Sequence, residues 1–204
     1  MPQLFSKEHL PIINQKHPLT RKYTKSRRNG RKKMYITGYH GTSNSAANAI
    51  ANTGEFKVSQ GDKQWLGDGI YFYCSFEKAL NWQYKKNDPL PEAVIHALIR
   101  VDESEVFDAD SSEGVRVCTA ISDYICEAAH VTSSRAHAEK NQCRIMNMIW
   151  ETNPEIKVIA CSLPDEPTRL LSLMDLRRKH KEFCIRNNES IAYIHVIQRG
   201  DINE

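Results

Sequence analysis

From about residue 34 onward, short strand-like runs alternate irregularly with helix-like segments, and this order constrains the fold more than any other feature. Runs rich in β-branched and aromatic residues predict strands at 33–41, 70–76, 91–102, 156–163, 182–186 and 191–197. Apolar residues at helical spacing predict helices at 43–54, 75–86, 118–131, 134–151 and 167–181, and the acidic stretch 103–120 is expected to be irregular. Strands and helices mixed without a regular repeat are typical of an α+β domain.

The length and the cysteine pattern exclude several classes of protein. The 204 residues suffice for one domain with a substantial core. No apolar run approaches the roughly 20 residues that a membrane span needs, and the N-terminal residues lack the apolar core of a signal peptide. Six cysteines occur, none in a Cys-x-x-Cys pair and none at zinc-finger spacing from a histidine. We therefore expect a cytoplasmic protein with reduced, mostly buried thiols, no metal and no membrane contact.

Residues 16–33 differ from the rest of the chain in charge. They hold nine cationic residues and no acidic one, whereas acidic residues outnumber basic ones in the remainder. Because this stretch has little apolar content to offset the entropy of ordering, we expect residues 1–33 to form a mobile arm and residues 34–204 to form the folded domain. A cluster of cations is suited to the phosphates of nucleic acid. The candidate nucleic-acid-binding residues are Arg21, Lys22, Lys25, Arg27, Arg28, Arg31, Lys32 and Lys33.

Three short motifs carry the candidate chemistry. The first is the run GYHGTS at 38–43, where a predicted strand meets a turn. The second is LGDGIYF at 66–72, in which glycines precede an aromatic strand. The third is EFCIR at 182–186, which opens a late strand. Each motif alone is common in structural roles, so their occurrence together and in this order is the informative feature.

In order and in strand context, the motifs resemble the poly(ADP-ribose) polymerase and diphtheria-toxin branch of the ADP-ribosyltransferases. That family has His-Gly-Ser/Thr at the end of a strand, then Gly-x-Gly-Ile-Tyr-Phe, then a late strand that opens with Glu-Tyr/Phe. The resemblance covers residues 36–82 and about 180–197, and it does not extend to 103–178. It implies an ADP-ribosyltransferase-like fold of split antiparallel β-sheets with flanking helices, and NAD⁺ as a substrate without a metal.

The resemblance also implies a role for each motif residue. His40 would bond the adenosine ribose, and the backbone of Gly41, supported by Thr42, would hold the nicotinamide carboxamide. Tyr71 would stack on nicotinamide, and Glu182 would bond the nicotinamide ribose. Such roles suit a reaction whose transition state resembles an oxocarbenium ion. The expected catalytic residues are His40, Tyr71 and Glu182, and the expected NAD⁺-binding residues are His40, Gly41, Thr42, Gly69 and Tyr71.

The expected reaction is transfer of one ADP-ribose unit from NAD⁺ to a macromolecule, with release of nicotinamide. The basic arm favours nucleic acid as the acceptor, RNA ahead of DNA, with a protein acceptor as the alternative. Small free-standing transferases of the resembling family are often toxins of bacterial conflict systems. That role would require a neutralising antitoxin as a partner.

Other interpretations remain open. The chain could be a catalytically degenerate member of the fold that binds ADP-ribose or a protein, or chiefly a nucleic-acid-binding protein. Glu189 is a rival of Glu182, although it lies in the turn-like run NNES. His180 and Glu182 have the His-x-Glu spacing of zinc deaminases, but the Pro-Cys-x-x-Cys of those enzymes is absent. The loop 55–66 is a candidate lid over NAD⁺ or an ordinary surface connection.

Overall fold

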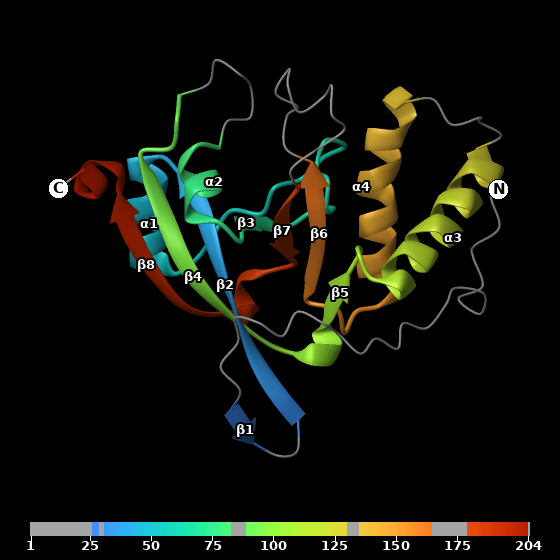
Figure 1. Cartoon of the computed structure of the whole chain (residues 1–204), viewed down its shortest axis with the longest axis horizontal. Helices are drawn as coiled ribbons and strands as arrows, with labels where there is room; N and C mark the ends of the chain where they lie inside the picture. The colour runs from blue at the N-terminus through green and yellow to red at the C-terminus, as the bar shows by residue number, and fades with distance from the viewer. Residues whose placement is uncertain (1–25, 29–30, 83–88, 130–134, 165–178, 204) are drawn as a thin grey trace.

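The computed structural model of the chain describes residues 26–28, 31–82, 89–129, 135–164 and 179–203. Its strands are β1 (Ser26–Arg28), β2 (Arg31–Thr42), β3 (Ile70–Tyr73), β4 (Ala93–Asp102), β5 (Val106–Asp108), β6 (Val158–Pro164), β7 (Lys179–Ile185) and β8 (Ile191–Gln198). Its α-helices are α1 (Asn44–Thr53), α2 (Phe76–Leu80), α3 (Ser112–Ala129) and α4 (Arg135–Thr152). The strands form one sheet with helices on its faces, so the predicted α+β class is confirmed (Figure 1).

The sheet consists of two halves, with the strand order β5-β6-β7-β3-β2-β4-β8 and β1 paired to β2. In the first half, β2, β4 and β8 pair antiparallel over long stretches. In the second half, β3, β7 and β6 pair antiparallel, but β5 pairs parallel with β6. The expectation of purely antiparallel sheets is therefore wrong at β5. Because α3 and α4 lie between β5 and β6, the chain crosses over and returns in the same direction.

The two halves meet at a narrow seam. Between β2 and β3 the sheet contains a single residue pair, Tyr39 with Tyr73. Next to this pair, a Cβ atom on Gly38 would lie 2.4 Å from the Phe183 ring and 2.8 Å from the Cβ atom of Phe72. Glycine at this position therefore lets aromatic side chains of the second half pack directly on the β2 backbone.

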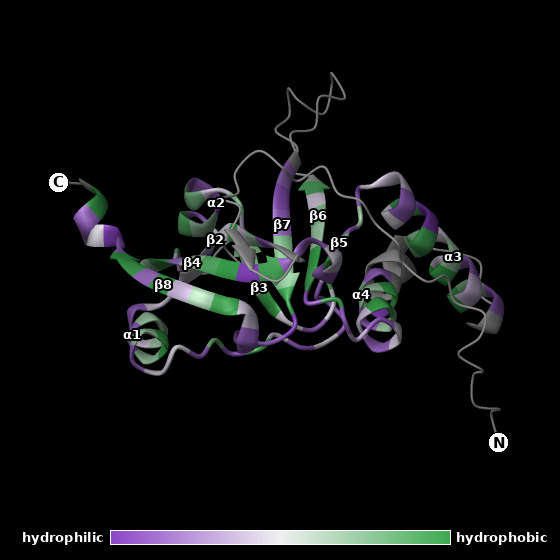
Figure 2. Cartoon of the chain, turned by 90° about the horizontal axis from the view of Figure 1, so that it is seen from below, coloured by the Kyte–Doolittle hydropathy of each residue, from purple (hydrophilic) through white to green (hydrophobic). Residues whose placement is uncertain are grey.

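Two apolar cores hold these layers together. The first lies between the halves and α1, and it contains residues such as Ile36, Ile95, Phe72 and Phe183. The second joins α3 and α4 to the other face of β5, β6 and β7, through residues such as Ile149. Figure 2 shows α1 and α2 on opposite sides of the first half, with α3 and α4 beside the second half. Each half thus has its own helical support.

Local capping explains why the first helix forms where the sequence predicts it. The Ser43 hydroxyl accepts a hydrogen bond from the Ala46 backbone, and Gly54 ends α1 with φ 74°.

Two predictions of secondary structure are wrong. The acidic stretch 103–120 contains β5 and the start of α3, because Val106 and Phe107 are buried. The last residues of the helix predicted at 167–181 belong to β7, where they pair with β6, and 165–178 lie outside the described residues.

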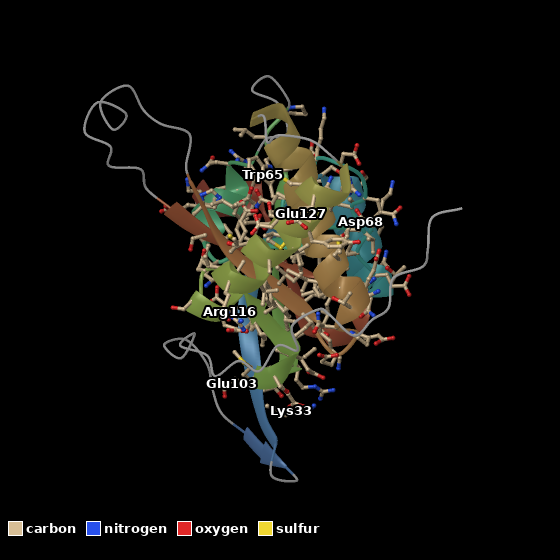
Figure 3. All side chains as sticks on the ribbon, turned by 90° about the vertical axis from the view of Figure 1, so that its right-hand side faces the viewer. Lys33, Trp65, Asp68, Glu103, Arg116 and Glu127 are labelled. Atoms are coloured by element: carbon tan, nitrogen blue, oxygen red, sulfur yellow. The ribbon has the colours of Figure 1, made fainter. Side chains whose placement is uncertain are left out.

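The boundary of the basic arm also differs from the prediction. The folded part begins before residue 34, because β2 starts at Arg31 and pairs with β1 to form a hairpin. Figure 3 shows Lys33 at the end of the molecule from which this hairpin projects, with Glu103 close to it. Arg21, Lys22 and Lys25 lie outside the described residues. The predicted arm is thus partly a pair of strands.

The cysteines match the expectation only in their redox state. All six are free thiols, but Cys143 and Cys184 alone are buried, and Cys74 is exposed. The prediction of mostly buried thiols is therefore wrong. No helix in the described part of the chain is both long and apolar enough to cross a membrane.

Candidate functional site

The candidate site begins where β2 and β3 separate at the seam. Beyond the pair of Tyr39 and Tyr73, β3 turns away from the end of β2. The imidazole of His40 bridges the gap, since its Nδ1 atom lies 2.9 Å from the backbone oxygen of Tyr71. A carbonyl oxygen only accepts hydrogen bonds, so Nδ1 carries the proton. The first two motifs are therefore connected by a side chain where the strands have ceased to pair.

The surroundings of His40 keep its ring neutral. Phe56 packs edge-on against the imidazole at a centroid distance of 5.3 Å, and Phe72 lies 5.8 Å away. Burial lowers the pKa of His40 below its ordinary value, and this effect outweighs the opposing hydrogen bond to Tyr71. In the neutral ring with Nδ1 protonated, Nε2 carries a lone pair. His40 is thus suited to accept a hydrogen bond from a hydroxyl group of a ligand.

Tyr71 is fixed by the turn that precedes its own strand. Its hydroxyl oxygen accepts a hydrogen bond from the Leu66 backbone at 2.8 Å and donates to the Gly67 carbonyl at 2.8 Å. The ring packs against the second core, and burial raises the pKa of Tyr71 well above its ordinary value. Because both functions of the hydroxyl are used within the chain, the ring and not the hydroxyl would have to contact a ligand.

Glu182 lies in the middle of β7, not at its beginning, and is only 9% exposed. Its Oε1 atom is 2.6 Å from Nε2 of His180, which is two residues earlier on the same strand. Tyr73, directly opposite on β3, also shares a hydrogen bond with Glu182. Burial, followed by the Glu182 charge, raises the pKa of Tyr73 above its ordinary value. The carboxylate is therefore held from two sides in a largely dry environment.

The structure brings the three predicted catalytic residues together only in part. Tyr71 and Glu182 lie on one face of neighbouring antiparallel strands, since their direct partners are Cys184 and Tyr73. Such diagonal neighbours are about 7–8 Å apart. His40 is linked to Tyr71 through the backbone, but its ring packs against Phe56 and Phe72 of the first core, on the opposite face. A ligand that used all three residues would have to pass through the seam between the halves.

The motif glycines are required by packing within the chain itself. A Cβ atom on Gly41 would lie 2.0 Å from the backbone oxygen of Ala79 in α2. A Cβ atom on Gly69 would lie 2.3 Å from the Cys184 sulfur and 2.6 Å from the Ile185 backbone oxygen. Both contacts are far shorter than van der Waals distance, so the protein alone accounts for these glycines. Their roles in binding NAD⁺, like the role of Thr42 at the end of β2, stay predictions.

The rival carboxylate and the candidate lid are placed clearly. Glu189 is exposed, in the 3-10 turn η3 (Asn188–Ser190), whereas Glu182 is buried among hydrogen-bond donors, so the geometry favours Glu182.

The candidate lid, the loop 55–66, lies against His40 through Phe56. The Asn188 side chain accepts a hydrogen bond from the Phe56 backbone N–H at 2.8 Å and donates one to the Phe56 backbone oxygen at 3.1 Å. Ser59 is bonded to Gly69 by two backbone hydrogen bonds. These anchors oppose movement of the loop as a whole.

Sequence reasoning missed the partners that orient Glu182. The sequence indicates His180 only through its zinc-deaminase spacing, and it does not indicate Tyr73. The period of two along a strand places residues 180 and 182 on one face, so this signal was available. The register that sets Tyr73 opposite Glu182 was not. No group of three or more potential ligand side chains within the described ranges could hold a metal ion.

Comparison with known proteins gives a limited result. The chain matches no protein-family model. An uncharacterized protein of Methanocaldococcus jannaschii is 41% identical over 83 residues, which make up 38% of this chain and 39% of that protein. The similarity thus spans about two fifths of each protein, and the name of the relative assigns no activity.

Proposed function

We propose that the chain is an NAD⁺-dependent mono-ADP-ribosyltransferase of the His-Tyr-Glu type, with an ADP-ribosyltransferase-like fold. It transfers one ADP-ribose unit to a macromolecule and releases nicotinamide. The observation that carries this proposal is the convergence of three strands at the seam. His40 of β2 is bonded to the backbone of Tyr71 in β3, and Tyr71 shares a face with the buried Glu182 of β7.

Each side chain supplies what the reaction needs. The buried Glu182 carboxylate stabilises positive charge as it develops on the nicotinamide ribose. The ring of Tyr71, held by its hydroxyl, offers a flat surface to nicotinamide. The neutral imidazole of His40 accepts a hydrogen bond from the adenosine ribose, and the backbone at Gly41 and Thr42 holds the carboxamide.

The favoured acceptor is nucleic acid, with RNA ahead of DNA. Five cationic residues lie on β1 and the first three positions of β2, namely Arg27, Arg28, Arg31, Lys32 and Lys33. The hairpin that carries them projects from the body of the molecule (Figure 1). Cationic residues on such a hairpin can hold phosphates without reading a sequence, and they would bring a nucleic-acid strand to the protein for modification. A protein acceptor and a binding-only role are the alternatives.

The experiment is incubation of the purified chain with NAD⁺ labelled in its adenylate part, in the presence of separated RNA, DNA and protein pools. Nicotinamide release and the labelled product are measured together, and Glu182→Gln is the matched control. Release of nicotinamide with label in RNA or DNA supports the proposal. Label in protein alone would overturn the assignment of nucleic acid as the acceptor. Binding of NAD⁺ or ADP-ribose without any release of nicotinamide would show a binding module.

A second set of variants tests recruitment by the hairpin. Because β2 starts at Arg31, removing residues 1–33 would cut into the sheet, so substitution is preferable to deletion. Replacement of Arg27, Arg28, Arg31 and Lys32 by Gln should leave NAD⁺ binding unchanged and abolish transfer to RNA at moderate salt. A variant that modifies RNA as well as the parent does would show that the hairpin is not a recruiter.

A further inference from the structure

His180, which none of the three motifs includes, forms a close pair with Glu182 on β7. Their Nε2 and Oε1 atoms are 2.6 Å apart, and their side chains are 18% and 11% exposed. Tyr73 completes the group from β3, with its ring 5.6 Å from the His180 ring. In a strand, residues two apart point to the same face, so this contact follows directly from the spacing. The pair is therefore built into the strand and does not depend on a flexible loop.

Three other groups of the described strands lie on the same face as Glu182 and carry no charge near pH 7. Cys161 is its direct partner on β6, and burial followed by the Asp110 charge raises the pKa of this thiol to about 12. Burial also raises the pKa values of the Cys184 thiol and the Tyr71 hydroxyl. All three groups are consequently neutral near pH 7. They leave the orientation of the carboxylate to its hydrogen-bond donors.

The neighbouring lysine is engaged elsewhere. Lys181 lies between His180 and Glu182 in sequence, and its side chain points to the opposite face of the strand. Its Nζ atom lies 2.8 Å from Asp108 and 3.5 Å from Asp110. Lys181 thus links β7 to Asp108 of β5 across β6 and leaves Glu182 to His180 and Tyr73.

We propose that His180 is a positioning residue for Glu182, a role that rests on the proposed transferase function. The Nε2–H group of His180 donates to Oε1 of Glu182 and keeps the carboxylate in the rotamer that faces the nicotinamide ribose. A glutamate has three side-chain torsions, and a carboxylate that must first be oriented stabilises a transition state less than a fixed one does. Partners of this kind change rates about 10- to 100-fold without touching the substrate.

The test uses the full chain with two substitutions at one position. Leu in His180→Leu keeps much of the volume and removes the donor, whereas Gln in His180→Gln keeps an N–H donor. His195→Leu on β8 is the matched control, because it makes the same chemical change on an exposed position of the other half of the sheet. Nicotinamide release gives kcat and KM for NAD⁺, thermal unfolding confirms folding, and NMR reports the His180 Nε2–H proton.

In His180→Leu we expect kcat to fall about 10- to 100-fold with KM within about threefold, while His180→Gln recovers most of the rate and His195→Leu is unchanged. The His180 Nε2–H signal should shift in Glu182→Gln. An active parent with a normal kcat in folded His180→Leu would overturn the positioning role and leave the proposed function intact. A parent that never releases nicotinamide would overturn both. If His180→Leu does not fold, a fall in kcat for His180→Gln as large as that of Glu182→Gln would overturn the role.

Discussion

The two halves of the sheet differ in how they are built. In the first half, β2 pairs with β4 from Lys33 to Thr42 without interruption, and most of β4 is buried and apolar. In the second half, β3 and β5 are short, and the buried carboxylates Asp108 and Glu182 lie on β5 and β7, whereas the one buried carboxylate on the described strands of the first half is Asp102 at the end of β4. The first half is thus the more continuous of the two, and the second carries the buried carboxylate of the third motif. The candidate catalytic residues therefore lie where the sheet has few backbone hydrogen bonds, and helices and side-chain pairs support it there.

The largest effect on stability is expected at the seam, where the Phe183 ring of the second half packs against Gly38 of the first half. Phe183 is 1% exposed and stacks on Phe72 at a centroid distance of 5.4 Å. Phe183→Ala should lower the free energy of unfolding by about 3–5 kcal/mol, as measured by urea denaturation. Tyr193→Ala, at a half-exposed position on β8, is the control and should stay within about 0.5 kcal/mol. Equal losses of unfolding free energy in both variants would show that the seam contributes no more to stability than an exposed strand position does.

The second prediction concerns the buried charge of the second half. Glu182→Gln keeps the size of the side chain and removes its charge, so transition-state stabilisation is lost while NAD⁺ contacts remain. We expect kcat for nicotinamide release to fall at least about 100-fold, with NAD⁺ affinity nearly unchanged. Glu189→Gln is the control, because Glu189 is exposed on the turn after β7. If Glu189→Gln is inactive and Glu182→Gln is active, the catalytic role belongs to Glu189.

The third prediction concerns the side chain that links the halves. His40→Ala removes the bridge to the Tyr71 backbone and the acceptor proposed for the adenosine ribose. Loss of such a partner costs about 1–3 kcal/mol, which corresponds to a fall in NAD⁺ affinity of about 5- to 150-fold. Titration calorimetry on the folded variant measures the NAD⁺ affinity. His96→Ala, on β4 of the first half, should bind NAD⁺ normally. Unchanged binding in both variants would show that NAD⁺ does not bind at His40.

The smallest effect is expected at a second link between the halves. Glu105, after β4, lies 2.6 Å from Lys157, just before β6. Burial alone would raise the pKa of Glu105, but hydrogen bonds from Lys157 and the Asp102 backbone outweigh it and hold that pKa below its usual range. Glu105→Gln should therefore cost less than about 1 kcal/mol at pH 7.

The pH dependence of that cost follows from the direction of the shift. A carboxylate with a depressed pKa contributes stability above its unfolded-state value, here 4.5, and loses it as pH falls through the folded-state value. The difference between Glu105→Gln and the parent should thus shrink when urea denaturation is repeated near pH 3. A difference that grows toward acid pH would show that the ion pair is not its cause.

The sequence predicts local features of this fold better than distant ones. The first helix is bounded by Ser43 and Gly54, whose capping roles depend only on adjacent residues. The short strand β5 escapes prediction because its three residues are stabilised by parallel pairing with β6, about 50 residues later. For the same reason, Lys179–Lys181 look helical from their composition, whereas pairing with β6 makes them a strand.

The candidate site shows the same limit. The motifs name His40, Tyr71 and Glu182, yet the sequence does not reveal that the Tyr71 hydroxyl is used within its own turn or that His40 packs on the opposite face. Those facts depend on the register between β3 and β7 and on the path of the loop through Phe56. Residue types thus indicate a chemistry, whereas the availability of each functional group is decided by packing that only the folded chain shows.

The single pair of Tyr39 and Tyr73 has a mechanical consequence. In a continuous sheet, each strand is hydrogen-bonded to its neighbour at several points. Here a single residue pair joins the two halves within the sheet, and the other links between them are the apolar core, the His40 bridge and the pair of Glu105 with Lys157. A ligand that contacted both His40 and the β3 backbone would add one more connection across this boundary.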